Sequence, residues 1–511
     1  MGSSYDRSSK GEDIHFKNGQ IWDSVGMRFR KGELILSDGI IEEITFGATS
    51  KAQHGKGTEV FDIKGGYVSP GFIDGHMHLF QWSISRSGLD LSHCRSLKEI
   101  VALIESVVDG RLENRMFQMT GIVMGVDFDD SPFQSGIVDN NRHLEDRFPD
   151  IPVIARRICG HKAIANTLGL EVLGISEDGH INGLLIEDHA MDIPWHLPIQ
   201  ESVSIDLYRK AAEELYGNGV VGGVDIIPLS QYGRLMDIQD TSEIIFRSAI
   251  SMIRDVSMGP PYENGPENDS PFISEIGKPE YRLGLSFEKF FLDGSIGART
   301  ASFDRDYLDA PKFPLLHSDE ELKEMVMRSY GEGLVPMVHC IGEAAISQAI
   351  RVLEGIGGPY RLEHAEAMTD EHLAAMNNGK GGLCLQPNFQ HIWGRKGGLY
   401  EKALGSSEGL NRLRSIVGSK VPWCFGTDMM PPSPLYAFKG GMEHPYPSQR
   451  LLLSEMVEGF TVGAARLSFL EDEYGFNFKV GSSPDIAVLN KDLASVSATL
   501  IGGRMVFNEG T

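Results

Sequence analysis

Short apolar runs alternate with helical patterns from residue 64 to about residue 437, and this alternation limits the possible folds more than any other feature. A strand followed by a helix, repeated along a chain, predicts a parallel sheet covered by helices. The strand-like runs in this stretch are Gly66–Ile73, Ile151–Ile158, Val220–Ile226, Ile244–Ile253, Leu285–Leu292, Val335–Cys340, Tyr360–His364, Gly382–Gln386 and Val421–Gly426. The predicted fold class is therefore α/β, and a closed (β/α)8 barrel of the TIM type fits best.

The two ends of the chain differ in pattern from its middle. Residues 1–63 and residues 471–511 contain short apolar or alternating runs separated by turn signals, which is typical of small antiparallel sheets. Because chain termini often lie close together, we expect these two segments to form one small β-sandwich beside the barrel.

The middle of the chain is longer than a plain barrel requires. A plain barrel takes about 250 residues. Residues 64–437 already exceed that length, and the last barrel helices are expected only after them, at residues 438–470. The irregular region at about residues 84–200 has the most room for extra structure. We therefore expect a large insertion after the first barrel strand.

The charge of the chain argues against several classes of partner. Its 511 residues include 47 Lys and Arg against 71 Asp and Glu, which gives a formal net charge of −24. This acid excess argues against a nucleic-acid backbone or an anionic membrane as the main partner. A small-molecule substrate is the partner that we expect.

Cysteine usage and hydropathy bear on the compartment. Five cysteines, an odd number without a C-x-x-C pair, argue against a disulfide framework and favour a reducing environment. The first residues lack the apolar core of a secretory signal, and no run reaches the roughly 18 apolar residues of a membrane span. We expect a cytoplasmic protein that forms a homo-oligomer, with a dimer as the commonest case.

The sharpest local signal is His76-Met77-His78, at the end of an apolar run. Two residues apart on a strand, both imidazoles point to the same face, and imidazole binds zinc and similar cations. The pair is at the carboxyl end of its predicted strand, where barrel enzymes keep their active sites. For this motif alone, two surface histidines at a strand end remain the alternative.

Four more polar residues occupy the same kind of position. His339, His364 and Asp428 each end or follow a strand-like run, and Lys289 lies inside one. Taken singly, each has an ordinary explanation: a rim histidine, an aspartate that caps the next helix, or a lysine that reaches solvent. Together they predict a cluster of metal-compatible groups at one rim of the barrel.

Lys289 stands among Phe287, Phe290 and Phe291. A charged ammonium is costly to bury in such surroundings, so the pKa of Lys289 should fall. A neutral amine can take up CO₂ and become a carbamate, an anionic oxygen ligand that is able to bridge two cations. If the amine stays unmodified, it would repel a second cation and the site would hold one metal.

Several segments resemble one known family. They are SPGFIDGHMHLF at 69–80, KFFLDGSIGARTA at 289–301, MVHCIGEAAI at 337–346, RLEHAE at 361–366, QPNFQ at 386–390 and FGTDMMPPSP at 425–434. They are similar to the amidohydrolase superfamily, specifically to its YtcJ-like branch, amidohydrolase family 3. The resemblance extends from about residue 14 to residue 511, and the order His-x-His, Lys, His, His, Asp is specific to it.

The resemblance implies a role for each member of the cluster. The implied metal ligands are His76, His78, Lys289, His339, His364 and Asp428. They would hold one or two divalent cations, with zinc expected, and carboxylated Lys289 would bridge the pair. Asp428 would also be the general base that receives the proton of the attacking water.

Four further residues are candidates for contact with the substrate. His161 could hydrogen-bond a substrate carbonyl and is the second catalytic candidate, although a structural histidine is an equal alternative. Arg299 could clamp a substrate carboxylate, but pairing with a local acid such as Asp304 is the simpler expectation. Trp82 could form a wall of the pocket and Gln386 could offer a polar contact, with packing and loop hydrogen bonds as their alternatives.

The combined prediction is an enzyme, a metal-dependent hydrolase of carbon–nitrogen bonds other than peptide bonds. An amide, cyclic amide or formamide-like substrate would be cleaved by a metal-activated water, with Asp428 as general base. The same site could instead serve deamination, ester or lactone hydrolysis, or isomerisation. A metal-free barrel acting as a scaffold is the non-enzymatic alternative, and the complete set of ligand positions argues against it.

Overall fold

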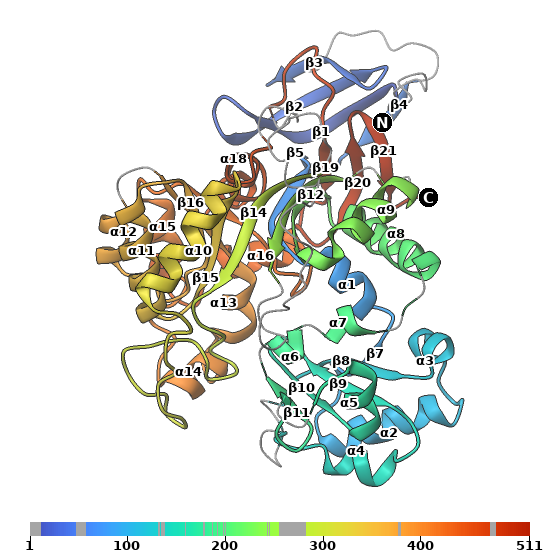
Figure 1. Cartoon of the computed structure of the whole chain (residues 1–511). Coiled ribbons are helices and arrows are strands. Elements are labelled where there is room, and N and C mark those ends of the chain that lie inside the picture. The colour runs from blue at the N-terminus through green and yellow to red at the C-terminus, as the bar shows by residue number, and fades with distance from the viewer. Residues whose placement is uncertain are drawn as a thin grey trace.

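The computed structural model describes most of the chain. The described residues are 12–47, 58–254 (except 131–132, 134–137, 159, 177–178, 187, 192, 198, 200, 243 and 245), 283–376, 380–470 and 477–510. They form three sheets with their helices, and Figure 1 shows the barrel in the middle, with one sheet above it and another below. The expected ends of the terminal domain, residues 1–11 and 511, lie outside the described residues.

The central sheet has eight strands that pair in parallel, in the order β18-β17-β16-β15-β14-β13-β12-β6. The strands are β6 (Phe72–Met77), β12 (Val220–Pro228), β13 (Arg247–Ile253), β14 (Leu283–Phe291), β15 (Val335–Cys340), β16 (Tyr360–His364), β17 (Gly381–Leu385) and β18 (Trp423–Phe425). Each follows its neighbour in chain order, as expected for a (β/α)8 barrel. The expectation of a parallel α/β barrel is confirmed at this level.

β6 and β18 are the two outer strands of this sheet. Hydrogen bonds join β6 to the residues that directly follow β18. The Asp74 carboxylate of β6 accepts from the backbone N–H of Thr427 at 2.8 Å, just after β18. The backbone N–H of Asp428 in turn donates to the carbonyl of His76 at 2.9 Å. The sheet is therefore nearly closed, and the closure lies beside two of the residues expected in the site.

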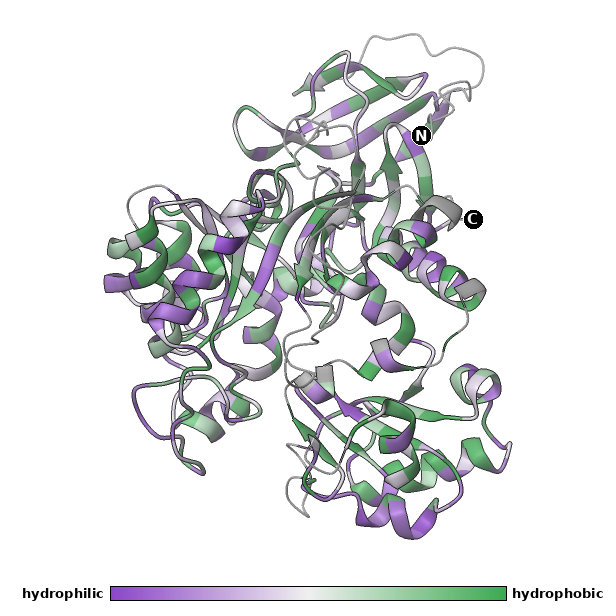
Figure 2. Ribbon diagram, in the orientation of Figure 1, coloured by the Kyte–Doolittle hydropathy of each residue, from purple (hydrophilic) through white to green (hydrophobic). Residues whose placement is uncertain are grey.

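Helices cover the outside of the barrel because each has one apolar face. They include α8 (Glu201–Gly217), α9 (Tyr232–Ser242), α10 (Asp319–Gly331), α11 (Glu343–Ile356), α12 (Asp370–Ala375), α16 (Pro434–Met442), α17 (Leu453–Glu458) and α18 (Ala464–Leu467). Helix α10 starts at a capping box, in which Ser318 and Glu321 satisfy each other's backbone N–H groups. In Figure 2 hydrophobic residues run along the strands, and hydrophilic residues gather on the surrounding helices.

A second eight-stranded sheet combines both ends of the chain. Its order is β21-β20-β19-β5-β1-β2-β3, with β4 paired to β1. The strands are β1 (Ile14–Asp23), β2 (Arg28–Ser37), β3 (Ile40–Phe46), β4 (Glu59–Asp62), β5 (Tyr67–Pro70), β19 (Ile486–Leu489), β20 (Val496–Ile501) and β21 (Arg504–Asn508). The two termini thus meet through the antiparallel pair β5 and β19 in one sheet.

One expected strand is two strands in the structure. The run Gly66–Ile73 was predicted to be the first barrel strand, but it divides between β5 of the terminal sheet and β6 of the barrel. The break comes at Gly71, where an added Cβ would lie 2.6 Å from a methyl group of Val221. The chain can change sheets there because glycine allows that close approach.

The part of the chain between β6 and β12 forms a third sheet, with the strand order β11-β10-β9-β8-β7. Its strands are β7 (Leu89–Asp90), β8 (Val123–Phe128), β9 (Val153–Arg157), β10 (Lys162–Ala165) and β11 (Leu184–Ile186). Its helices are α2 (Leu97–Val108), α3 (Arg115–Thr120), α4 (Arg142–Arg147), α5 (Thr167–Leu173), α6 (Asp188–Met191) and α7 (Ile193–His196). This inserted sheet has its own apolar cluster, which includes Ile100, Phe128 and Val153.

Among the described residues, no helix combines the length and the apolar character that are needed to cross a membrane. Four cysteines, Cys94, Cys340, Cys384 and Cys424, are free and buried. Cys159 lies outside the described residues.

Candidate metal centre

His76, His78 and Asp428 meet where β6 and β18 come together. Asp428 Oδ1 lies 3.3 Å from His78 Nε2 and 3.7 Å from His76 Nε2. One ligand atom from each of the three residues lies within 4.8 Å of the other two. Two imidazole nitrogens and a carboxylate oxygen so close together form a donor set that suits a divalent cation.

His339 and His364, at the ends of β15 and β16, extend this cluster. The ring of His364 lies 4.7 Å from that of His76 and 4.5 Å from that of His339, centroid to centroid. Both side chains are about 3% exposed. Four histidines from three strand ends therefore surround one small volume.

Three of the histidines have one ring nitrogen held by a hydrogen bond. Nδ1 of His76 donates to the Glu363 carboxylate at 2.5 Å, and Nδ1 of His364 donates to Gln386 Oε1 at 2.8 Å. Nε2 of His339 donates to the carbonyl of Gly294 at 3.2 Å. Such bonds fix the tautomer and leave the other nitrogen of each ring with a lone pair for a metal.

Burial keeps these imidazoles neutral. Burial, together with the nearby Lys289 amine, lowers the pKa of His76 to about 4, although Glu363 opposes the shift. Burial and the neighbouring cationic groups hold the pKa of His339 and of His364 well below the usual range. A neutral imidazole is the form that binds a metal, so these rings need lose no proton at neutral pH.

The Asp428 carboxyl is ionised despite its burial. Burial raises its pKa, but the hydrogen bond from His78 and the electrostatic influence of the nearby His76, His78 and Lys289 outweigh this effect and bring the pKa to about 2. Asp428 and His364 also have left-handed backbones, with φ of 54° and 68°. Non-glycine residues in this region carry strain that is typical of functional sites.

Lys289 of β14 has a buried amine without a hydrogen bond. Its side chain is 3% exposed, and among the described residues Nζ has no hydrogen-bond partner. The amine lies 5.3 Å from the centre of the Phe291 ring. Burial lowers the pKa of Lys289 to about 8, against the opposing charges of Glu363 and Asp428.

A cavity of about 440 Å³ opens over these groups. It is lined by all six residues that the sequence singled out as metal ligands, namely His76, His78, Lys289, His339, His364 and Asp428. His161, just before β10, and Trp82, on α1 (Leu79–Ser85), also line it. The His161 ring lies 6.0 Å from that of His339, so the inserted sheet contributes to the wall of the cavity.

Two residues proposed for the substrate have other partners. Arg299 lines neither this cavity nor the smaller one described below, and its guanidinium donates two hydrogen bonds to Asp309 at 2.7 and 2.8 Å. The expectation of pairing with a local acid is confirmed, although the acid is Asp309 and not Asp304. Gln386 also lines neither cavity, since its side chain holds His364.

Sequence reasoning missed the acids behind the histidines. Glu363, which orients His76, is itself held by Arg361 Nε at 2.6 Å, and both side chains are buried. Burial raises the pKa of Glu363, but Arg361 and His76 outweigh it and bring the pKa to about 2. Burial raises the pKa of Asp74 and of Glu366 to about 7. The available signal was the position of these acids, inside β6 and β16 or just after β16.

Comparisons with known proteins identify the family that the chain matches. The profile of the amidohydrolase family matches residues 59–507. The chain is 25% identical to the protein LONG AFTER FAR-RED 3 of Arabidopsis thaliana, over 97% of this chain and 91% of that protein. It is 24% identical to the protein YtcJ of Bacillus subtilis, over 70% of each.

The fold also matches solved structures. An uncharacterized metal-dependent hydrolase from Pyrococcus horikoshii aligns with a TM-score of 0.70 at 23% identity, covering 94% of this chain and 98% of that one. Its counterpart from Pyrococcus furiosus gives 0.69 at 22% identity, covering 94% and 99%. The chain belongs to the amidohydrolase family, as the resemblance of its motifs indicated.

Proposed function

We propose that the protein hydrolyses a carbon–nitrogen bond other than a peptide bond, in an amide, cyclic amide or formamide-like substrate. The observation that supports this most is the cluster of four histidines, an ionised carboxylate and an amine without a hydrogen-bond partner among the described residues, all at one cavity. Such a donor set matches what one or two divalent cations require.

The groups divide into two sets of ligands. His76, His78 and Asp428 would hold one cation, because their ligand atoms are already close together. His339 and His364 would hold a second, with Lys289 between the two sets. Lys289 fits this role best as a carbamate: its neutral amine adds to CO₂, a proton leaves, and the buried Nζ gains an anionic group.

The chain's own residues then move the proton. Bound divalent cations polarise the scissile carbonyl and lower the pKa of water, which is the chemistry that they supply. Asp428, ionised and in contact with His78, accepts the proton of the attacking water as the new C–O bond forms. It passes that proton to the nitrogen as the C–N bond breaks, and His161 donates a hydrogen bond to the substrate oxygen.

The test combines metal analysis with a substrate panel. Protein purified without chelator should contain close to two divalent ions per chain, with zinc expected, as measured by mass spectrometry. The panel contains amides, formamides, cyclic amides, dipeptides, esters and lactones. Hydrolysis confined to the first three classes supports the proposal, and hydrolysis of only the last three contradicts it.

The variant Asp428→Asn tests the base. Loss of a general base costs about 10²–10⁴-fold, so we expect kcat to fall about a thousandfold while the protein stays folded. The matched control is Asp146→Asn, at a carboxylate whose side chain is 74% exposed. Equal activity of the two variants would remove Asp428 from the mechanism.

A further inference from the structure

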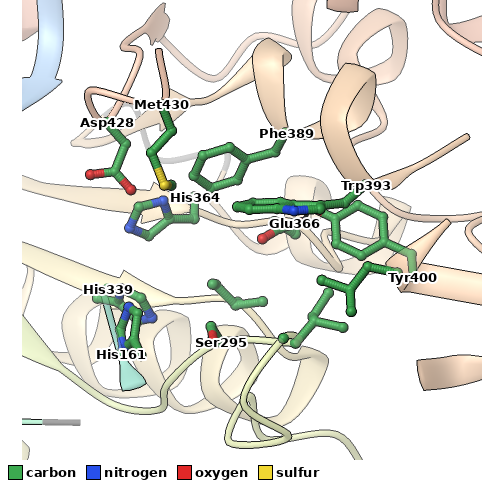
Figure 3. A pocket seen from close by; sticks show the side chains of 14 residues that line it. His161, Ser295, His339, His364, Glu366, Phe389, Trp393, Tyr400, Asp428 and Met430 are labelled. Carbon is green, nitrogen blue, oxygen red and sulfur yellow. Dashed lines mark hydrogen bonds between the residues drawn. The ribbon is translucent and has the colours of Figure 1, made fainter. Parts of the chain in front are cut away.

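A second, smaller cavity adjoins the metal centre. Its volume is about 30 Å³, which is room for two or three water-sized positions. We call it the side chamber, and the residues that bound it include Glu366, Phe389, Trp393 and Tyr400 (Figure 3). Gly297 also lines it. A chamber of this size accepts a group of a few non-hydrogen atoms and no more.

Three aromatic rings make the walls of the side chamber flat and apolar. The Phe389 ring stacks on that of His364, with centroids 5.9 Å apart and planes 10° apart. The Trp393 ring follows at 4.8 Å from Phe389, and the Tyr400 ring at 6.2 Å from Trp393. Aromatic rings that line a wall in this way favour a small planar group that lies against them.

Two acids line the side chamber, Glu366 and Asp428, and Glu366 is the one outside the proposed set of metal ligands. Its side chain is buried, and one oxygen, Oε2, accepts hydrogen bonds from the Tyr400 hydroxyl and from Asn411 Nδ2. The other oxygen, Oε1, accepts no hydrogen bond from any described residue. A buried carboxylate with one free oxygen favours a ligand that donates an N–H.

The side chamber and the wide cavity meet at the metal centre. His161, His339, His364, Asp428 and Met430 line both of them. A bond that is cleaved at this junction would have one substituent in the side chamber and the other in the cavity of about 440 Å³. The two spaces differ so much in volume that they require a small substituent on one side and allow a large one on the other.

We propose that the side chamber is a substrate subsite for a small planar group that carries an N–H donor, such as a primary carboxamide, and that Glu366 Oε1 accepts its hydrogen bond. The proposal rests on the hydrolase function above and narrows its substrate class. The preferred substrate is an amide with a small N–H-bearing acyl group and a bulkier amine.

Two chromogenic anilides test this preference. The 4-nitroanilide of malonamic acid ends in CO–NH₂ and that of acetoacetic acid ends in CO–CH₃, so they have the same scissile bond and nearly the same shape. Hydrolysis of either one releases 4-nitroaniline. We expect wild-type kcat/KM to favour the carboxamide at least about tenfold, because a site built around a hydrogen bond rejects an analogue that lacks the donor.

The variant Glu366→Gln should abolish or reverse the preference. Asn411 Nδ2 can only donate, so the glutamine carbonyl must face Asn411 and its NH₂ must face the side chamber. The acceptor in the chamber thereby becomes a donor. The control Glu324→Gln, at an exposed position of α10, removes the same charge and should keep the wild-type ratio. A ratio unchanged in folded, metal-loaded Glu366→Gln overturns the assignment, as does a wild type without preference.

The variant Gly297→Ala tests the chamber without altering Glu366. The added methyl would lie 3.4 Å from Arg157 Nη1 and from Leu399 Cδ2, so it fits with little displacement and reduces the space. The rate of hydrolysis of both anilides should then fall relative to that of 4-nitroformanilide, which has no group to place there. An equal change for all three anilides contradicts the proposed location.

A binding measurement separates this proposal from the function on which it rests. If the wild type hydrolyses no amide, the proposed function fails, and ligand-observed NMR with propionamide and butanone still tests the chamber. Propionamide should bind more tightly than butanone to the wild type but not to Glu366→Gln. Equal binding of the two compounds to the wild type would show that the chamber does not select an N–H donor.

Discussion

The barrel and the inserted sheet each bury a lysine on a strand, and they treat it in opposite ways. Lys162 of β10 lies 2.6 Å from the Asp130 carboxylate, which also accepts from Arg157 at 2.8 Å. Lys289 of β14 is more deeply buried, and its amine has no hydrogen-bond partner among the described residues. The inserted sheet thus neutralises its buried charge internally, whereas the barrel leaves an amine unsatisfied at the point where its strand ends converge.

The difference teaches how to distinguish a structural polar group from one kept for chemistry. A buried polar group without a partner costs free energy, and native proteins retain few of them. The Asp130 carboxylate offsets the cost of burying the Lys162 ammonium. Burial raises the pKa of Asp130, but Lys162 and Arg157 outweigh this effect and hold the pKa below its usual range. No described residue gives the Lys289 amine a hydrogen bond that would offset its burial, and this supports a ligand or a modification at that amine.

Replacing Lys289 should have the largest effect on the centre. In Lys289→Met we expect the metal content to fall from two ions per chain to one or none, because the bridging group is gone. The urea midpoint of the metal-free protein should not fall, because the variant removes an unpaired buried amine. Metal analysis and urea unfolding check both statements. Unchanged metal content would make Lys289 a structural residue and erase the contrast with Lys162.

The matching variant in the inserted sheet should affect stability instead. Lys162→Met leaves Asp130 with one cation in place of two, and we expect a loss of about 2 kcal/mol in the free energy of unfolding. The metal content should stay that of the wild type, since Lys162 lies in the inserted sheet and lines neither cavity. Urea unfolding and metal analysis provide the readouts. Loss of metal with unchanged stability would show that Lys162, and not Lys289, serves the metal centre.

A histidine away from the centre gives a smaller, pH-dependent effect. His444 is buried, Nε2 donates to the carbonyl of Asn411 at 3.1 Å, and Nδ1 accepts from the backbone N–H of Tyr446 at 3.2 Å. Burial lowers its pKa to about 4. Both ring nitrogens are in use, unlike those of the histidines at the centre, so His444 is a structural counterpart to them.

The sign of the pH effect follows from that pKa. A folded pKa below the unfolded value of about 6.5 gives stability that is complete above pH 6.5 and decreases as the pH falls toward 4. Between pH 8 and pH 5 we expect a loss of about 2 kcal/mol due to His444. The difference in unfolding free energy between wild type and His444→Gln isolates it. A difference independent of pH would show that His444 has the same pKa in the folded and the unfolded protein.

The sequence was most informative where the local pattern decides the structure. Val335–Cys340 is a barrel strand with the predicted bounds, because a buried parallel strand reads as a nearly continuous apolar run. The polar residues at the ends of the barrel strands converge because the carboxyl ends of parallel strands share one rim. The gathering of His76, His339 and Asp428 could therefore be predicted without knowing a single contact.

Contacts between distant segments could not be read in this way. Glu363 orients His76 across 287 residues of chain, and nothing in its neighbourhood names that partner. The side chamber combines Glu366 with Trp393 of α13 (Pro387–Trp393) and Tyr400 of α14 (Leu399–Leu404), so its shape depends on how loops pack. Arg299 pairs with Asp309 and not with Asp304, and no pattern in the sequence distinguishes these two acids.

The hydrogen bonds that join β6 to the residues after β18 have a consequence for folding during synthesis. Thr427 is 353 residues beyond Asp74, so the bond that joins the first and last barrel strands forms only when almost the whole chain exists. During synthesis, a nascent chain that ends before Asp428 can contain all the barrel strands. It still lacks the third residue of the set formed by His76, His78 and Asp428. Binding of a cation to these three residues would then stabilise only a chain that has been translated past its last barrel strand.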